Sequence, residues 1–327
     1  MKAEFANLCQ SLGLGVIIQE PKALTGGLMH KMYRVTADQG SYCIKVLNPE
    51  VMARPEALGN LIRSEEIASA LQDLVPLAAA KRFDGSAVIK QEQQFYMVFD
   101  FLEGSPIYAP GLSPKHCAAI GHLLGIIHKA DVRVPGIQAE TADAPIFQWE
   151  SFQEMALQQE WGASFIQVIP KLKEWNQKAA EAAQILSARQ VISHRDLDPK
   201  NVMWQGDSPV IIDWEAAGYV NPYQELMEVC SYWAADTNGG VDQEKFDALL
   251  QAYRQSVSLD GVDWEPVLAG GMNGMLGWLE YNLKRALHLI KCPAEEQELG
   301  VQQIKGTIRE LYEYEAKSGT MKRILNS

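Results

Sequence analysis

The sequence lacks several features that mark whole classes of protein. None of its five cysteines stands in C-x-x-C spacing and their number is odd, so neither a disulfide framework nor a zinc site is expected. No apolar run approaches the roughly 20 residues needed to cross a bilayer. The N-terminal stretch carries Glu4 and no long apolar run, unlike a signal peptide. These absences predict a cytoplasmic protein that does not bind a membrane.

Positive charge is also scarce. The chain has 29 Lys and Arg against 41 Asp and Glu, a formal net charge of -12. Because nucleic-acid binders are more often basic, nucleic acid is not an expected partner. An acidic surface suits a cationic ligand, but it also suits plain solubility. With 327 residues, of which 47% are hydrophobic, the chain is long enough for two lobes or domains, and its oligomeric state stays open.

The first hundred residues carry mainly strand and turn signals. Short β-branched and aromatic runs predict strands at 16–18, 32–36, 42–47 and 95–101. Residues 38–40 predict a hairpin turn, and apolar residues at helical spacing predict one helix over 55–72. The segment 103–106, Glu-Gly-Ser-Pro, then breaks the pattern.

Helical periodicity dominates the rest of the chain. Helices are predicted at about 113–130, 147–187, 222–236, 242–256, 262–290 and 294–316. A strand-rich island at 190–214 interrupts them. We therefore predict an α+β fold of two lobes: a β-rich N-terminal lobe, 1–102, and a mainly helical C-terminal lobe, 103–327.

Three polar residues of this island suit phosphoryl-transfer chemistry. Asp196 follows the apolar run 191–192, Asn201 comes five residues later, and Asp213 closes the apolar run 210–212. Two hairpin-like strands would bring the three side chains to one edge. Carboxylate and amide oxygens suit Mg²⁺. Phosphoryl transfer needs that metal to neutralise phosphate charge, and a carboxylate to orient the attacking hydroxyl.

Each of these residues alone has an ordinary structural interpretation. An Asp after a strand is usually a turn or cap former, and His194 could simply be packed. Together, H-R-D-x-x-x-x-N and an apolar strand ending in Asp resemble the catalytic loop of protein kinases and, more closely, of the aminoglycoside phosphotransferase and choline kinase families. The resemblance implies a protein-kinase-like fold, ATP and Mg²⁺ as cofactors, and transfer of the γ-phosphate to a hydroxyl, with Asp196 as catalytic base and Asn201 and Asp213 on the metal.

The resemblance extends to the N-terminal half. Lys45, in Tyr-Cys-Ile-Lys-Val, is similar to the strand lysine that contacts the α- and β-phosphates. The resemblance implies a glutamate partner on the next helix, Glu65 rather than Glu66, with the choice still open. The segment Thr25-Gly26-Gly27 resembles a phosphate-covering loop, although it is not G-x-G-x-x-G.

The run 95–102 resembles the strand and hinge that hold adenine. By that resemblance Phe99 borders the base pocket, and the backbone carbonyl of Asp100 and the backbone N–H of Leu102 pair with the base. A plain core strand with a linker fits the same residues, and both interpretations can hold together.

Two absences favour a small-molecule acceptor over a protein. Asp213 is followed by Trp214-Glu215 rather than Phe-Gly, and no Ala-Pro-Glu follows, so the activation segment of protein kinases is missing. Asp198-Pro199 resembles the His-Pro pair of aminoglycoside phosphotransferases, with Asp in place of His. A protein kinase and a catalytically silent nucleotide-binding protein are the alternatives. The second is disfavoured because Lys45 and the three catalytic-loop residues are all present.

The acceptor is the open question. Trp278 and Tyr281 share a helical face beside Glu280, and such an aromatic and acidic wall could hold an ammonium group. Packing of the two aromatics in the core is an equally good interpretation. Glu215 and Asp198 are further candidates for contacts with the substrate. We expect a small hydroxyl-bearing acceptor, cationic by this interpretation and aminoglycoside-like or choline-like.

Overall fold

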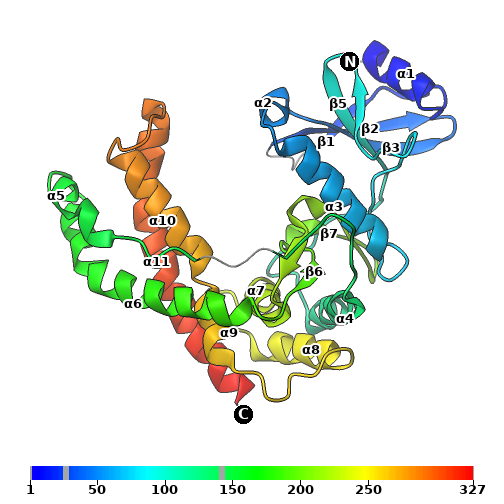
Figure 1. Ribbon diagram of the computed structural model, residues 1–327. Coiled ribbons are helices and arrows are strands. Elements are labelled where there is room, and N and C mark those ends of the chain that lie inside the picture. The colour runs from blue at the N-terminus through cyan, green and yellow to red at the C-terminus, as the bar shows by residue number, and fades with distance from the viewer. Residues whose placement is uncertain (1, 25–28, 140–143, 327) are drawn as a thin grey trace. The chain divides into compact units, whose positions relative to one another are not determined.

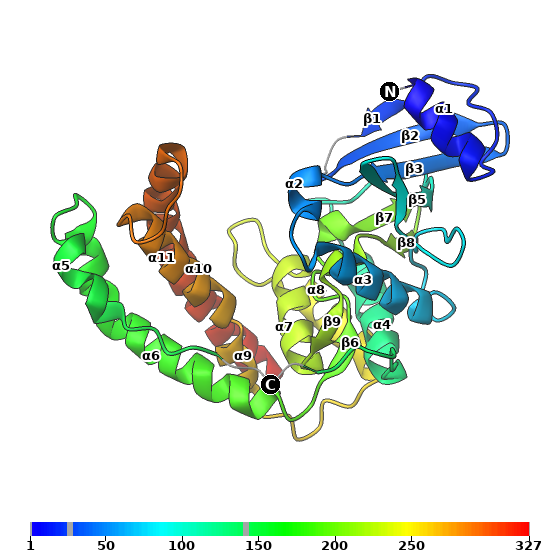
Figure 2. The ribbon, with the colours of Figure 1, turned by 45° about the horizontal axis from the view of Figure 1, so that its top comes forward.

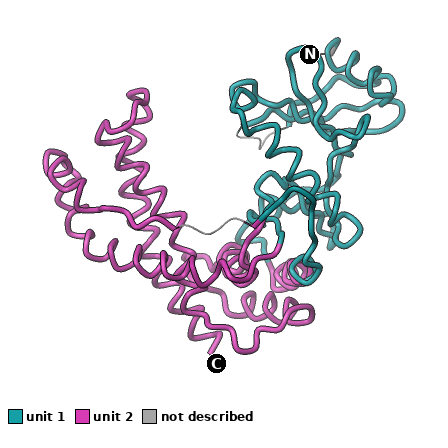
Figure 3. The backbone as a smooth tube through the Cα atoms, viewed as in Figure 1, with its two compact units in different colours: residues 1–112, 126–138, 192–218 teal, residues 113–125, 139–191, 219–327 magenta. Residues whose placement is uncertain are grey.

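The computed structural model describes residues 2–24, 29–139 and 144–326. Figure 1 labels its elements, and Figure 3 shows its division into two compact units. Unit 1 comprises 1–112, 126–138 and 192–218, and unit 2 comprises 113–125, 139–191 and 219–327. The units group the 192–218 segment with the N-terminal residues. The lobe boundary predicted at residue 102 stays a prediction.

Unit 1 contains a five-stranded antiparallel sheet. Its strands, in spatial order, are β1 (Lys22–Leu24), β2 (Lys31–Ala37), β3 (Gly40–Val46), β5 (Gln94–Asp100) and β4 (Ile89–Gln91). Strands β2 and β3 close on the predicted turn, with Ala37 paired to Gly40. The strands predicted at 32–36, 42–47 and 95–101 are confirmed. The one at 16–18 is wrong, since Ile17 makes only an isolated bridge to Ala37.

The two faces of this sheet are covered by different helices. Helix α1 (Lys2–Ser11) packs on the face that carries Tyr42 and Ile44 (Figure 2). Met97 shares a second apolar cluster with Leu61 of α3 (Ala57–Leu71). Since Lys45 pairs with Met97 in the ladder and strand side chains alternate, Lys45 points to the face that α3 covers. The short helix α2 (Pro49–Met52) links β3 to α3.

The predicted island, 190–214, and the residues just after it fold as short strands and turns. The elements are β6 (Val191–Ser193), the 3₁₀ turn η2 (Pro199–Asn201), β7 (Val202–Gln205), β8 (Ser208–Ile211), the 3₁₀ turn η3 (Trp214–Ala216) and β9 (Gly218–Val220). Strands β7 and β8 form a hairpin in which Val202 pairs with Ile211. The backbone N–H of Ile212 donates to the carbonyl of Asn201 at 2.9 Å. This pairing brings Asn201 beside the residue that precedes Asp213.

The segment that leaves the sheet lies against this hairpin. The N–H of Ser105 donates to the carbonyl of Trp204 at 3.3 Å. Gly104 has φ +115°, and a Cβ on it would lie 2.2 Å from that carbonyl oxygen. Position 104 therefore requires glycine for both its backbone conformation and its space.

Unit 2 is mainly helical. Its elements are η1 (Trp149–Phe152), α5 (Gln153–Ala156), α6 (Gly162–Leu186), α7 (Pro222–Trp233), α8 (Gln243–Arg254), α9 (Trp264–Gly270), α10 (Asn273–Ala286) and α11 (Ala294–Leu325), and α4 (Pro114–Ala130) crosses from one unit to the other. The single helix predicted at 262–290 is wrong. It breaks between α9 and α10, where a Cβ on Gly271 would lie 2.0 Å from the Tyr314 hydroxyl.

Helices α6, α10 and α11 share one hydrophobic core, which includes Trp175, Leu276 and Leu311. Helices α10 and α11 lie side by side (Figure 1). Their backbones approach closely at Gly300, where a Cβ would lie 3.2 Å from the carbonyl oxygen of Asn282. None of the described helices is both long and apolar enough to span a bilayer. The predicted cytoplasmic location stays a prediction.

Candidate active site

His194 anchors the catalytic loop to the end of β8. Its ring is fully buried and meets the Trp214 ring edge-on at 4.7 Å. The backbone N–H of Asp196 donates to Nδ1 at 3.3 Å, so the proton lies on Nε2, which donates to the carbonyl of Ile212 at 3.0 Å. The packed interpretation of His194 is therefore confirmed. The role of this residue is to hold the loop in place.

Asn201 orients the carboxylate of Asp196. Its Nδ2 donates to Oδ2 of Asp196 at 2.9 Å and to the backbone carbonyl of the same residue at 2.8 Å. With both amide hydrogens on Asp196, the Asn201 side-chain oxygen is turned away from that carboxylate. The remaining carboxylate oxygen, Oδ1, accepts from the Lys200 ammonium at 3.2 Å.

Lys45 is held by two carboxylates that follow β8. Its Nζ lies 3.3 Å from Oδ1 of Asp213 and 2.5 Å from Oε1 of Glu215. Burial lowers the pKa of Lys45, but the charges and hydrogen bonds of Asp213 and Glu215 outweigh burial and raise the pKa above its ordinary value. The ammonium is therefore charged although the residue is only 8% exposed. Asp213 has a left-handed backbone, φ +61°, a conformation that is uncommon for residues other than glycine.

The predicted glutamate partners of Lys45 lie on α3 but do not pair with it in the described chain. Glu65 is buried, and its Oε2 accepts from the backbone N–H of Ala80 at 2.8 Å. Burial raises the pKa of Glu65, while the Ala80 hydrogen bond and the Lys45 charge oppose the rise. Glu66 instead pairs with Arg82 at 2.9 Å. Of the two glutamates, Glu65 is therefore the one whose charge acts on Lys45. The direct ion pair of Lys45, however, is with Glu215.

His30 completes this cluster. Its Nδ1 accepts the backbone N–H of Asn48 at 3.0 Å, so Nε2 carries the proton and faces Oε2 of Glu215 at 3.9 Å. The pKa of His30 is lowered, mainly by burial and also by the positive charge of Lys45. The negative charges of Glu215 and Asp213 oppose this lowering. The neutral imidazole therefore turns an N–H group toward the Glu215 carboxylate and adds no charge to the cluster.

Asn201 and Asp213 together fit a magnesium ion. They supply one amide oxygen and one carboxylate, the hard-oxygen chemistry that Mg²⁺ prefers. Among the described residues, no group of three or more His, Cys, Asp and Glu side chains could hold a metal. An ion at Asn201 and Asp213 would therefore complete its shell with water and phosphate oxygens, as Mg²⁺ does in kinase sites.

The structure places the predicted adenine-binding residues at the end of β5. Phe99 and Asp100 are its last two residues and lie opposite Cys43 and Tyr42 of β3, and Leu102 lies two residues after the strand. The Asp100 side chain pairs with Lys81 at 2.7 Å. The predicted phosphate-covering segment, Thr25-Gly26-Gly27, lies outside the described residues.

The predicted aromatic wall of α10 already has a cation. The rings of Trp278 and Tyr281 are stacked, with centroids 5.6 Å apart, and both are partly exposed. The guanidinium of Arg285 lies 5.2 Å from the Tyr281 centroid and 5.8 Å from that of Trp278. Glu280 pairs with Lys284 at 2.5 Å. Arg285 and Lys284 of this chain therefore already make the ring and carboxylate contacts that were predicted for an ammonium group of the substrate.

Two other predicted substrate residues have structural partners. Asp198 caps η2, where its Oδ1 accepts the N–H of Lys200 at 2.8 Å, and Glu215 pairs with Lys45. Lys200 and His30 were not among the predicted site residues. Lys200 could have been found from its position four residues after Asp196, but nothing local in the sequence indicated His30.

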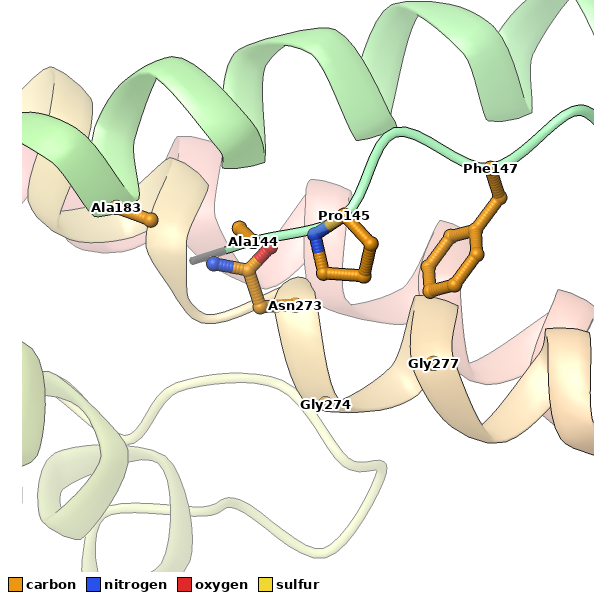
Figure 4. Close-up of a pocket in the computed structure, with 7 residues that line it drawn as sticks. All are labelled: Ala144, Pro145, Phe147, Ala183, Asn273, Gly274 and Gly277. Carbon is orange, nitrogen blue, oxygen red and sulfur yellow. The ribbon is translucent and has the colours of Figure 1, made fainter. Parts of the chain in front are cut away.

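An open pocket of about 320 Å³ lies beside this wall in unit 2. Figure 4 shows the faces that line it: Gly274 and Gly277 of α10 form one side, and Pro145 and Phe147 lie across from them. Asn273 lines it too, with Nδ2 donating to the carbonyl of Ala179 at 3.3 Å. Because the two glycines have no side chains, α10 presents bare backbone to the pocket at these two positions, next to the side chain of Asn273.

The antiparallel sheet, the island and the Asp196, Asn201, Asp213 and Lys45 constellation define a protein-kinase-like phosphotransferase. A family model described as the phosphotransferase enzyme family, APH, matches residues 20–258. The chain belongs to this family. No curated protein sequence matches the chain.

Solved structures share the fold across nearly the whole chain. One is a spectinomycin phosphotransferase, APH(9)-Ia, in complex with ADP and spectinomycin, 13% identical, with a TM-score of 0.62 and 94% of each chain covered. Another is a choline kinase from Cryptosporidium parvum, 12% identical, with a TM-score of 0.57 and 96% of each chain covered. A third is a macrolide 2'-phosphotransferase from Brachybacterium faecium, 17% identical, with a TM-score of 0.56, covering 93% of this chain and 97% of that one. At these identities the likeness establishes the fold, and it confirms the predicted kinase-like class.

Proposed function

We propose that the protein is an ATP- and Mg²⁺-dependent kinase that phosphorylates a hydroxyl group of a small molecule. The observation that carries this proposal is the contact set in unit 1: Asn201 bonded to Asp196 at 2.9 Å and Lys45 paired with Asp213 at 3.3 Å. The spectinomycin phosphotransferase structure is a complex with ADP and spectinomycin, which supports a nucleotide and a small-molecule acceptor here.

Lys45 and the metal-site residues would bind the nucleotide. Lys45 is charged and buried, so it can contact α- and β-phosphate oxygens with little loss of conformational entropy. The Asn201 side-chain oxygen and the Asp213 carboxylate would hold Mg²⁺, which neutralises phosphate charge when bound. With Asp213 on a metal ion, Glu215 would still hold Lys45. This explains why Lys45 has two carboxylate partners.

Asp196 would act on the acceptor. Its Oδ2 is held by Asn201, so Oδ1 is the oxygen that orients the acceptor hydroxyl and takes its proton. The acceptor oxygen then bonds to the γ-phosphorus, and the bond from that phosphorus to the β–γ bridging oxygen breaks with its electron pair left on ADP. Positioning and electrostatic stabilisation supply most of the rate in such transfers.

The acceptor would pack against the pocket beside α10. Its bare backbone side at Gly274 and Gly277 allows a ring to approach closely. A cationic acceptor would not rely on Trp278 and Tyr281, whose rings already contact Arg285. We therefore propose an amino- or polyhydroxylated acceptor, aminoglycoside-like or choline-like, whose body lies in the α10 pocket.

A panel assay tests the proposal. Purified enzyme with MgATP would be mixed with aminoglycosides, macrolides, choline, homoserine and sugars, and ADP release measured for each. Asp196→Asn, which keeps the shape of the side chain, should lower turnover at least about 100-fold and leave the thermal shift with MgATP in place. Equal turnover by this variant and the wild type would remove Asp196 from the mechanism, and no shift with MgATP would refute the nucleotide site.

A further inference from the structure

Lys200 touches the catalytic carboxylate from a fixed position. Its backbone N–H donates to Oδ1 of Asp198 at 2.8 Å, and it follows Pro199 at the start of η2. The backbone at residue 200 is therefore held independently of the lysine side chain. The side chain itself is 52% exposed, and its Nζ lies 3.2 Å from Oδ1 of Asp196, so the ammonium can move while its anchor stays.

The oxygen that Lys200 contacts is the one that the reaction needs. Asn201 holds Oδ2 of Asp196 at 2.9 Å, so the acceptor hydroxyl would approach Oδ1. In a reactive complex, the attacking oxygen lies about 3–3.5 Å from the γ-phosphorus. An ammonium displaced from Oδ1 by that hydroxyl is thus within a few ångströms of the phosphoryl group being transferred.

The phosphoryl group also needs a cation that Lys45 does not supply. During transfer, the negative charge of the phosphoryl group spreads over its three equatorial oxygens. Lys45 is 8% exposed and tied to Asp213 and Glu215, which suits the α- and β-phosphates. Lys200 contacts Asp196, the residue proposed to meet the acceptor, and carries an ammonium with three N–H donors on a flexible four-carbon stem.

We propose that Lys200 is a further catalytic residue: its ammonium leaves Oδ1 of Asp196 when the acceptor hydroxyl binds there, and then contacts the phosphoryl group during transfer. The inference rests on the proposed function. Lys200 neither gains nor loses a proton in this step, because the hydroxyl proton passes to Asp196 and the electron pair of the broken bond stays on ADP. The competing role is structural, in which Lys200 only holds the Asp196 carboxylate in the free enzyme.

A phosphoryl mimic separates the two roles without knowledge of the acceptor, because a water molecule in the place of the acceptor hydroxyl can meet Oδ1 of Asp196 and release the ammonium. The affinity for MgADP would be measured alone and with aluminium fluoride, which occupies the phosphoryl position beside ADP. The variants are Lys200→Met and Lys200→Arg. The matched control is Lys178→Met, since Lys178 also pairs at i,i+4 with a carboxylate, Glu174, and is 54% exposed. Thermal melting would establish that each variant is folded.

In the wild type, fluoride should tighten MgADP binding. In Lys200→Met, the gain in MgADP affinity on addition of fluoride should be about 10- to 100-fold smaller than in the wild type, the range of one charge-assisted contact. Its affinity for MgADP without fluoride should be unchanged. Lys200→Arg should restore most of the loss, and Lys178→Met should behave as wild type. The kcat for MgATP turnover should fall in parallel, with the KM for ATP unchanged.

Three outcomes would overturn the inference. Lys200→Met could keep the full fluoride effect, it could weaken MgADP with and without fluoride equally, or the wild type could bind MgADP and gain nothing from fluoride. A wild type that does not bind MgADP at all refutes the proposed function instead, so the two failures are distinguishable.

Discussion

Adding methyl groups to the bare face of α10 separates the stability of the helix from binding of the acceptor. Gly274 and Gly277 line the pocket. A Cβ on Gly274 would meet nothing within 4 Å, and one on Gly277 would meet Phe147 Cζ at 3.9 Å, an ordinary contact. Both positions have negative φ and lie in α10. The fold should therefore accept Gly274→Ala and Gly277→Ala.

The expected effects on stability and activity have opposite signs. Alanine in place of glycine within a helix stabilises by about 0.5–1 kcal/mol, which raises the Tm by roughly 1–4 °C. A methyl group added to a binding pocket costs about 1–3 kcal/mol of transition-state binding, or 10- to 200-fold in kcat/KM for the acceptor. The KM for ATP should not change.

The matched control is Gly306→Ala. Gly306 lies in α11, also with nothing within 4 Å of an added Cβ, and outside the pocket. This variant should gain the same stability and keep full activity toward the best acceptor of the panel. If all three variants keep wild-type kcat/KM for that acceptor, the α10 pocket is not where its body lies. A fall in all three would mean that stiffer helices, rather than a filled pocket, impair turnover.

Two further predictions concern unit 1. Asp213→Ala removes the charged ligand proposed for Mg²⁺, so activity and the effect of Mg²⁺ on nucleotide binding should both be lost; equal MgATP binding by this variant and the wild type would show that the metal is held elsewhere. Burial raises the pKa of the half-buried Cys43 thiol to about 11, against the opposing effect of Lys45, so the thiol is protonated at pH 8 and iodoacetamide should label it much more slowly in the native than in the unfolded protein. Rapid labelling of the native protein at pH 8, located by mass spectrometry, would contradict that burial.

The catalytic loop could be predicted because its determinants are local. Asp196 and Asn201 are five residues apart, and the hairpin that brings Asn201 beside Ile212, the residue before Asp213, is formed by two adjacent strands, β7 and β8. Strand alternation, apolar runs and turn residues act over this same short range. The same holds for the β2–β3 hairpin that carries Lys45.

The partner of Lys45 could not be predicted in this way. Its contact with Glu215 joins residues 170 apart in sequence, and it depends on how α3 packs against η3. Both glutamates of α3 point away: Glu65 bonds to the Ala80 backbone, and Glu66 pairs with Arg82. A helix face indicates which side chains are buried, but not which buried donor each will find.

The contacts of a single helix, α10, also could not be predicted from the local sequence. Trp278 and Gly277 are neighbours in sequence, so their directions differ by about 100° around α10. The sequence indicated an aromatic face, but its partners depend on α11, whose Gln303 accepts the hydrogen bond of the Trp278 indole at 3.2 Å. Arg285, one turn beyond Tyr281, supplies the cation that lies against both rings. The pocket lies on the face of α10 that carries Asn273, Gly274 and Gly277. None of these residues is apolar and large, so hydrophobic periodicity does not distinguish this face from a solvent-exposed one.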